Sequence, residues 1–276
     1  MKTLVLTDFS HTSKRALEYT LDLLVTEGEQ TITLAHVVSK PADAAKAMEN
    51  FTPFLDGIAN PSNVSINKEI IHGDLYDATG AYSKKEGFEL IVFGTHGARG
   101  LQKVVGSHAV KLIQHTNCPV IVVQDEIRRD PDGIKQIALP LTLAVEDKKM
   151  LNYVSRIAKL MGAMIEVIYH EKTDEFLAAT MKRNLSFTKS FLDKAGIDHA
   201  LNAVAAKSNF DEEVVAIAAE KSCDLIATIN HHEDGIKNLF GWSFDQNMIE
   251  NNAHIPVLTI DAQPAGDVKD IFSTTM

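Results

Sequence analysis

One block of the sequence occurs twice, and this repeat limits what the chain can fold into more than any other feature. Residues 86–93 match residues 221–228 at an offset of 135. Two further apolar runs, 120–123 and 257–260, each follow a proline and close their half of the chain. Because 276 residues exceed what one hydrophobic core usually needs, the repeat predicts two domains of one fold in tandem.

The earlier parts of each half show the same order of elements. Apolar strands are predicted over 4–6 and 137–139, amphipathic helices over 13–24 and 147–161, and second strands over 31–38 and 164–170. Wholly apolar strands that alternate with helices indicate parallel sheets covered on both faces. We therefore expect two tandem doubly wound five-stranded α/β sheets. Their domains cover 1–125 and 136–262, with a charged linker over 126–135 and a loosely ordered tail over 263–276.

The acidic composition narrows the partners that the chain can bind. A formal net charge of -10 gives no attraction to phosphates, so binding to DNA or RNA is not expected. No apolar run is long enough to span a bilayer, and Asp8 interrupts the apolar residues that a signal peptide would need. The two cysteines, Cys118 and Cys223, form no CxxC motif and are interpreted as reduced structural thiols. We expect a cytoplasmic protein that does not bind membranes.

A glycine-rich loop follows the fourth predicted strand of the first half, residues 90–93. The loop reads GTHGARG over 94–100, and Gly106-Ser107 opens a helical stretch over 108–115. Glycines let a backbone approach a phosphate closely, and a helix start presents unpaired N–H groups and the positive end of its dipole. The loop fits neither the GxxxxGK[ST] nor the GxGxxG fingerprint. An anion site and a purely structural turn are therefore both compatible with the spacing.

The first half resembles the universal stress protein family in four strings that occur in the family's order: LTDFSHTSKRALEY, LAHVV, HGD at 72–74, and LIVFGTHGARGLQKVVGSHAVKLIQHTNCPVIVV. The resemblance implies a Rossmann-like parallel sheet with strand order 3-2-1-4-5. Nucleotide-binding members carry an acidic residue after the first strand and the pattern G-x2-G-x9-G-[ST]. This chain departs from that pattern, because eight residues rather than nine separate its second and third glycines.

By position, the resemblance implies that the first half binds ATP or AMP, with or without Mg²⁺. Asp8 is expected to contact the adenosine part with Thr7 and Phe9 beside it, and the backbone of Val37 to pair with adenine. The remaining expected contacts surround the phosphates: Gly94, His96, Gly97, Arg99, Gly106 and Ser107. The resemblance also implies that the last strands of the two halves, 120–123 and 257–260, pair within the chain. Whether the chain forms a homodimer as well is left open.

The second half has lost the residues of this site. At the offset of the repeat, Gly94 corresponds to Ile229, while Asp8 falls on Leu141 or Thr142. A carboxylate and a glycine are thus replaced by bulkier or uncharged groups, which would occupy the space of a nucleotide. We predict that the second half does not bind ATP.

The loop after the fourth strand of the second half carries ligand-type side chains instead. His231 and His232 are weak candidates for metal ligands, because adjacent loop residues supply at most two convergent groups. A polar, solvated loop is the alternative interpretation. A pocket for a different small molecule is a further one.

The sequence contains no motif that identifies a catalyst. No Ser/His/Asp set, nucleophile elbow or paired-carboxylate motif occurs. We therefore predict a stress-response protein that acts as a non-catalytic nucleotide-binding module, with at most weak ATPase activity, and whose protein partners are unknown. The alternatives are a nucleotide-independent interaction module and a nucleotidyl transferase of the same broad fold. The latter would need an HxGH-type motif, which this chain lacks.

Overall fold

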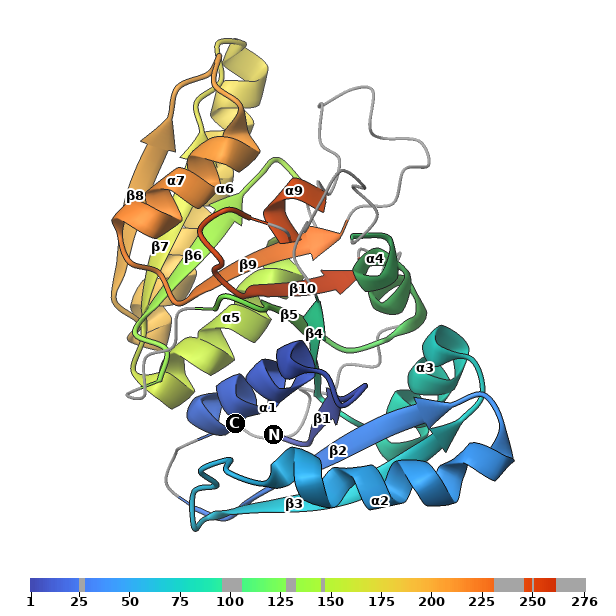
Figure 1. The fold of residues 1–276 in the computed structure, drawn as a ribbon. Helices are drawn as coiled ribbons and strands as arrows, with labels where there is room; N and C mark the ends of the chain where they lie inside the picture. The colour runs from blue at the N-terminus through green and yellow to red at the C-terminus, as the bar shows by residue number, and fades with distance from the viewer. Residues whose placement is uncertain are drawn as a thin grey trace.

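The fold is a single ten-stranded sheet with helices on both faces, seen in a computed structural model (Figure 1). The structure describes residues 1–24, 28–95, 106–127, 133–144, 147–230, 246–249 and 251–261. The strand order is β3-β2-β1-β4-β5-β10-β9-β6-β7-β8. Each half of the sheet therefore has the predicted order 3-2-1-4-5, read from its own first strand.

The first half alternates strands and helices as predicted. Its elements are β1 (Thr3–Leu6), α1 (His11–Leu23), β2 (Gln30–Val38), η1 (Pro41–Asp43), α2 (Ala44–Leu55), β3 (Val64–His72), α3 (Leu75–Glu86), β4 (Leu90–Thr95), α4 (Gly106–His115) and β5 (Val120–Gln124). Helix α1 begins two residues earlier than its apolar periodicity indicates. The reason is that Ser10 caps it, with its side chain accepting a hydrogen bond from the N–H of Ser13.

The second half repeats this order. Its described elements are β6 (Gln136–Leu141), α5 (Asp147–Met161), β7 (Met164–His170), α6 (Glu175–Ala195), β8 (His199–Val204), α7 (Phe210–Glu220), β9 (Leu225–Asn230), α9 (Gln246–Ile249) and β10 (Val257–Asp261). The bounds of α5 and β7 agree with the predicted ones to the residue. Strand β6 extends through Pro140, which lies opposite Ile168 of β7. The tail over 263–276 lies outside the described residues.

The two halves join through their last strands. Strands β5 and β10 pair antiparallel, with Val257 opposite Val122 and Thr259 opposite Val120, whereas the other strand pairs are parallel. This pairing confirms the predicted contact between the last strands. It also turns two edge strands into the centre of one sheet, so that neither presents unpaired backbone groups at the junction.

The junction is further tied by a buried amide. Gln124, at the end of β5, donates through its Nε2 to the carbonyl oxygens of Ile249 and Asn251, at 3.1 Å each. The side chain is 2% exposed, and both carbonyls belong to the segment that leads into β10. A buried carbonyl without a partner is costly, so these two bonds stabilise the approach of the second half to β5.

The helices cover the sheet unequally. One apolar cluster packs α1, α2, α5 and α6 on a single face and runs through both halves, including Leu17, Phe51, Met150 and Leu192. On the opposite face each half has its own cluster, under α3 and α4 in the first and under α7 and α9 in the second. Figure 1 shows α1 and α5 crossing the middle of the molecule on the shared face. The shared core thus binds the halves into one body.

The same carboxylate–backbone hydrogen bonds occur in both halves, as expected for two copies of one fold. The N–H of Lys2, before β1, donates to Glu89 Oε2 at 2.9 Å, and the N–H of Glu89 donates to the carbonyl of Lys2 at 2.8 Å. In the second half the N–H of Gln136 donates to Asp224 Oδ2 at 3.0 Å, and the N–H of Asp224 donates to the carbonyl of Gln136 at 2.8 Å. Each carboxylate fixes the first strand against the fourth.

Candidate functional site

The candidate site lies at the carboxyl ends of β1 and β4. The chain builds the sheet outward from β1 through β2 to β3, then returns to the other side of β1 with β4. Leu6 lies opposite Phe93, so the loops that follow β1 and β4 leave the sheet side by side. Ligands of open α/β sheets bind at such a switch point, outside the carboxyl ends of the strands.

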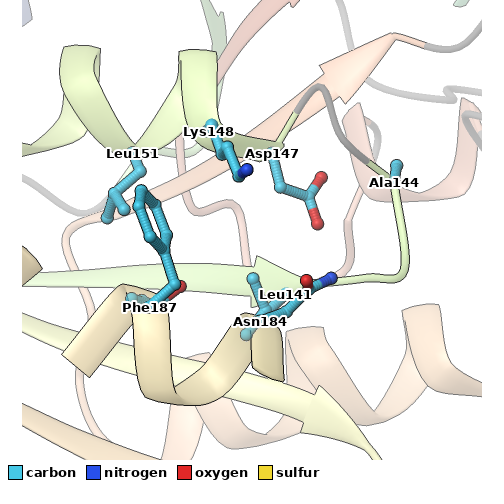
Figure 2. Close-up of a pocket in the computed structure, with 8 residues that line it drawn as sticks. Leu141, Ala144, Asp147, Lys148, Leu151, Asn184 and Phe187 are labelled. Carbon is cyan, nitrogen blue, oxygen red and sulfur yellow. The ribbon is translucent and has the colours of Figure 1, made fainter. Parts of the chain in front are cut away.

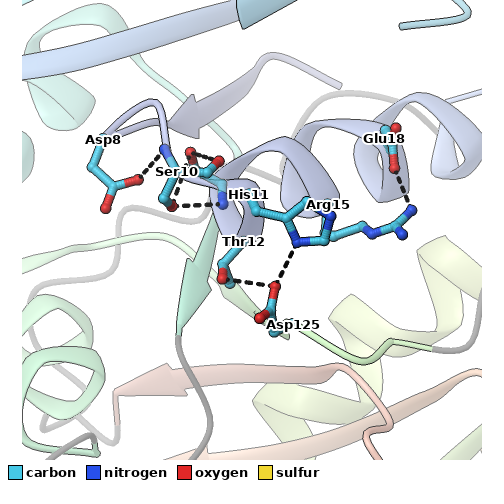
Figure 3. Close-up of polar contacts among 8 residues, drawn as sticks. Asp8, Ser10, His11, Thr12, Arg15, Glu18 and Asp125 are labelled. Atoms are coloured by element: carbon cyan, nitrogen blue, oxygen red, sulfur yellow. Dashed lines mark hydrogen bonds and ion pairs between the residues drawn. The ribbon is translucent and has the colours of Figure 1, made fainter.

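The loop after β1 is a tightly bonded turn (Figure 3). The side-chain oxygens of Thr7 and Ser13 lie 2.9 Å apart, and the N–H of Phe9 donates to Thr7 Oγ1 at 2.9 Å. Asp8 Oδ1 accepts from the N–H of Ser10 at 2.9 Å. Thr7 is thus a buried framework residue, whereas Asp8 is exposed to solvent.

Asp8 is held in its charged form. Partial burial raises its pKa, but hydrogen bonds from the side chain and backbone of Ser10, and a further one from Ser13, outweigh this effect, so that the pKa lies below its ordinary value. The charged carboxylate is an acceptor only, which suits it to hydroxyl or N–H donors of a ligand.

Phe9 has a backbone conformation that side chains rarely adopt, with φ of 64°. Such a conformation costs about 1–3 kcal/mol. Its ring lies among those of His36, Phe51 and Phe54, with centroids 4.6, 5.1 and 5.7 Å away. The side chain therefore packs under α2 and is engaged within the protein. Because its side chain is engaged in this way, Phe9 is available to contact a ligand mainly through its backbone.

His36 supports the same turn and was missed by sequence reasoning. Its Nδ1 lies 2.6 Å from the carbonyl oxygen of Thr7, and because that atom only accepts, Nδ1 carries the proton. The ring also packs against that of Phe9, tilted by 33°. Its place within the LAHVV string was the available signal, but the contact joins residues 29 apart and no spacing rule predicts it.

The peptide groups of Val37 point to the β1 side of β2, beyond the end of β1. The N–H of Thr7 bonds the carbonyl of Ala35, on the β1 side of β2, and the N–H of Gly73 bonds the carbonyl of Val38, on the β3 side. Successive residues of a strand turn their peptide groups to alternate sides, so those of Val37 point to the β1 side. Strand β1 has ended at Leu6, one residue before Thr7. Val37 therefore offers a donor and an acceptor beside the Asp8 turn.

Gly94 has a structural reason to be glycine. A Cβ at this position would lie 2.5 Å from the carbonyl oxygen of Thr12 and 2.8 Å from its methyl group. The missing side chain lets the first turn of α1 press against β4 and brings the Asp8 turn to the switch point. Gly94, which we expected to contact the phosphates, is therefore also needed for the packing of α1 on β4.

The rest of the predicted phosphate site is only partly described. Helix α4 begins at Gly106, as the glycine pattern indicates, and Ser107 lies in its first turn. His96, Gly97 and Arg99 fall outside the described residues.

A histidine and a carboxylate meet at the same edge of the sheet. His11 Nδ1 lies 2.8 Å from Asp125 Oδ1, and the Thr12 hydroxyl donates to the same oxygen at 3.0 Å (Figure 3). Asp125 follows β5, so the pair ties the start of α1 to the end of the first half. Sequence reasoning missed both residues, because they are 114 positions apart.

The equivalent position in the second half is closed. Strands β1 and β6 pair with corresponding residues of β4 and β9, and this alignment makes Thr142 the counterpart of Asp8. Asp147 Oδ2 accepts from the N–H of Thr142 at 2.6 Å and from its hydroxyl at 2.8 Å. The side chain of Asn184 donates to the carbonyl of Thr142 at 3.1 Å. The N–H, hydroxyl and carbonyl of Thr142 are thus all hydrogen-bonded within the protein.

A small hollow remains beside that turn, between α5 and α6 (Figure 2). It is lined by Leu141, Ala144, Asp147, Lys148, Leu151, Asn184, Phe187 and Thr188. Its volume of about 20 Å³ is enough for one water molecule and far too small for a nucleotide. Ile229, the counterpart of Gly94, is 5% exposed and packs into the shared core.

Other ligand chemistry finds little support in the part of the chain that the structure describes. No cluster of three histidine, cysteine or acidic side chains suits a metal ion there, and His231 and His232 lie outside those residues. Both cysteine thiols are free, and burial raises the pKa of Cys118 and Cys223 to about 12, which keeps them protonated and unreactive. No helix among the described residues is long and apolar enough to cross a membrane.

Comparisons with known proteins agree with the fold. Residues 1–124 match the model of the universal stress protein family. A universal stress protein from Archaeoglobus fulgidus DSM 4304 superposes with a TM-score of 0.69 at 16% identity, covering 94% of this chain and 96% of that one. A protein of unknown function from Pseudomonas aeruginosa PAO1 gives a TM-score of 0.61 at 15% identity, covering 94% and 92%. A search of curated proteins finds no match.

Proposed function

We propose, from the premise that this chain belongs to the universal stress protein family through residues 1–124, that its first half binds an adenine nucleotide. The bound nucleotide regulates the protein by altering its binding to other proteins. Hydrolysis of the nucleotide is at most slow. The second half supplies the other side of the shared sheet and binds no nucleotide. In this proposal the nucleotide-binding domain covers 1–125, a linker covers 126–135 and the degenerate domain covers 136–262.

The observation that carries the proposal is the position of Val37 of β2 beside the Asp8 turn, at the open end of β1. Val37 presents a peptide donor and acceptor, which match the edge of a purine. Asp8 presents a charged carboxylate, which matches the hydroxyl groups of a ribose. Two different recognition groups at a topological switch point favour a nucleoside over a simple anion.

The phosphates belong at the start of α4 in this proposal. The first turn of a helix offers unpaired N–H groups and a positive dipole end, and Gly106 and Ser107 stand there. His96, Gly97 and Arg99 complete the site on the family pattern. Magnesium would then be bound mainly by phosphate oxygens, as it usually is. Such a nucleotide sensor would work in the cytoplasm, where it meets ATP.

The proposal is tested by thermal unfolding with and without millimolar MgATP. A ligand at 100 times its dissociation constant stabilises the folded state by about 2.7 kcal/mol, a clear rise in the midpoint. Asp8→Ala should abolish the rise. Asp174→Ala is the matched control, because Asp174 is also a carboxylate that accepts a backbone N–H before a helix, at the start of α6.

The outcomes are distinct. No midpoint rise in the unmodified protein would reject nucleotide binding and leave the interaction module, in which the paired halves offer a surface to other proteins. An equal rise in Asp8→Ala would reject the assigned site. Phosphate release above a protein-free control would point to an enzyme instead of a sensor.

A further inference from the structure

A lysine and a histidine lie together where β7 ends, in the half that we assign no nucleotide. Lys172 Nζ is 3.4 Å from His170 Nδ1. The other ring nitrogen, Nε2, lies 2.9 Å from the carbonyl oxygen of Ala205 and must donate to it. This bond fixes the neutral tautomer, so the lone pair of Nδ1 faces the amine of Lys172.

The surroundings favour the uncharged form of both groups. The ring of His170 stacks on that of Phe210, at 5.3 Å and 17°. Desolvation by burial lowers the pKa of Lys172. Desolvation, and then the positive charge of Lys172, lower the pKa of His170, with the bond to Ala205 opposing them. A neutral base thus lies beside an amine that loses its proton more easily than a surface lysine does.

We propose that Lys172 is a site of covalent modification by small neutral aldehydes, with His170 as the group that accepts and returns the proton. Desolvation activates nucleophilic lysines, and an adjacent base activates other nucleophiles, and this pair combines the two. This inference is independent of nucleotide binding in the first half.

The reaction balances without a further reactant. His170 Nδ1 takes a proton from the ammonium, and the Nζ lone pair then forms a bond to the aldehyde carbon while the carbonyl π pair moves onto oxygen. A proton passes from nitrogen to that oxygen and gives a carbinolamine. His170 returns its proton to the hydroxyl, which leaves as water, and the product is the protonated imine of Lys172.

Charge around the pair selects a neutral electrophile. The first turn of α7, which begins at Phe210, carries Asp211, Glu212 and Glu213, and Glu171 separates the two residues of the pair. Anionic acyl donors such as acyl phosphates are repelled by this acidic surface. An uncharged aldehyde meets no such barrier.

The test is reductive labelling of the folded, full-length protein with propanal and cyanoborohydride, followed by peptide mass spectrometry. Lys172 should be propylated several-fold faster than Lys189, an exposed lysine of α6 whose ammonium lies 4.0 Å from Asp193. The preference for Lys172 over Lys189 should shrink as the pH rises toward the ordinary lysine pKa of about 10.4, where the amine of Lys189 also loses its proton. Acetyl phosphate should not label Lys172 preferentially.

His170→Gln distinguishes the role of His170 as a base from its structural role. A glutamine amide can still donate a hydrogen bond to the carbonyl of Ala205, but it cannot accept a proton. The variant should reduce labelling of Lys172 to the level of Lys189. His199→Gln, which changes a histidine of β8 that bonds the carbonyl of Ile197, should leave it unchanged. Equal rates at Lys172 and Lys189 in the unmodified protein, or an unchanged rate in His170→Gln, would overturn the proposal.

Discussion

The carboxylate of Asp147 accepts two hydrogen bonds from Thr142, one from its N–H at 2.6 Å and one from its hydroxyl at 2.8 Å. Thr142 stands in the second half where Asp8 stands in the first. In the first half the charged group comes from the turn itself and faces outward. In the second half it comes from the helix and faces inward. One fold has therefore kept its turn open in one copy and closed in the other.

Removing the inward carboxylate should destabilise the second half. Asp147→Ala leaves the buried N–H of Thr142 without its acceptor, and hydrogen bonds to charged groups contribute about 1.5–3 kcal/mol. We expect a loss of that size in the free energy of unfolding by urea. Asp147→Asn keeps an acceptor oxygen and should lose less. An equal loss in both variants would show that charge, not the acceptor, is what matters.

Gly94→Ala tests the packing of α1 on β4. The added methyl group would lie 2.5 Å from the carbonyl oxygen of Thr12, which is backbone and cannot swing aside. Overpacking of this kind costs about 1–3 kcal/mol. Urea unfolding should show this loss, and nucleotide affinity should fall with it because the Asp8 turn moves. Full stability in the variant would mean that α1 does not need the glycine.

Gln124→Leu tests the junction between the halves. The substitution fits the volume but leaves the carbonyls of Ile249 and Asn251 without their donor. An unsatisfied buried acceptor costs about 1–3 kcal/mol. We predict a loss of at least this size, together with faster hydrogen exchange at the amides of β10. Unchanged exchange in β10 would contradict the role given to Gln124.

Glu89 should make stability depend on acid pH. Partial burial raises its pKa, but the N–H of Lys2 and the guanidinium of Arg156 outweigh burial and set the pKa below the ordinary value of a glutamate. The folded pKa is therefore depressed, so the contribution is complete above the ordinary glutamate pKa and is lost as pH falls through the folded value. Glu89→Gln should lower stability near neutral pH and match the unmodified protein in strong acid. A stability difference between the two proteins that stays constant from neutral pH to strong acid would argue against the linkage.

The features that the sequence predicts well are those that depend on repetition. The duplicated apolar runs identify both halves, and the resemblance to the universal stress protein family implies the pairing of 120–123 with 257–260, which β5 and β10 form. Helix α5 is bounded correctly because its apolar periodicity is strong. Helix α1 begins earlier than predicted, since the capping hydroxyl of Ser10 lies outside the apolar pattern.

The features that the sequence does not predict are contacts over long separations. His36 with Thr7, and His11 with Asp125, join elements that only the sheet order brings together. The positive φ of Phe9 could not be predicted from the sequence either, because a phenylalanine gives no local signal for that conformation. The choice between Leu141 and Thr142 as the counterpart of Asp8 needed the strand register.

The central claim is one nucleotide site in a chain built from two copies of the fold, and its stoichiometry tests that claim most directly. Isothermal titration of the full-length protein with MgATP should give one site per chain, and Asp8→Ala should remove it. Thr142→Ala, the same change at the equivalent turn, should leave the stoichiometry at one. Two sites per chain, or one site that survives in Asp8→Ala, would contradict the account.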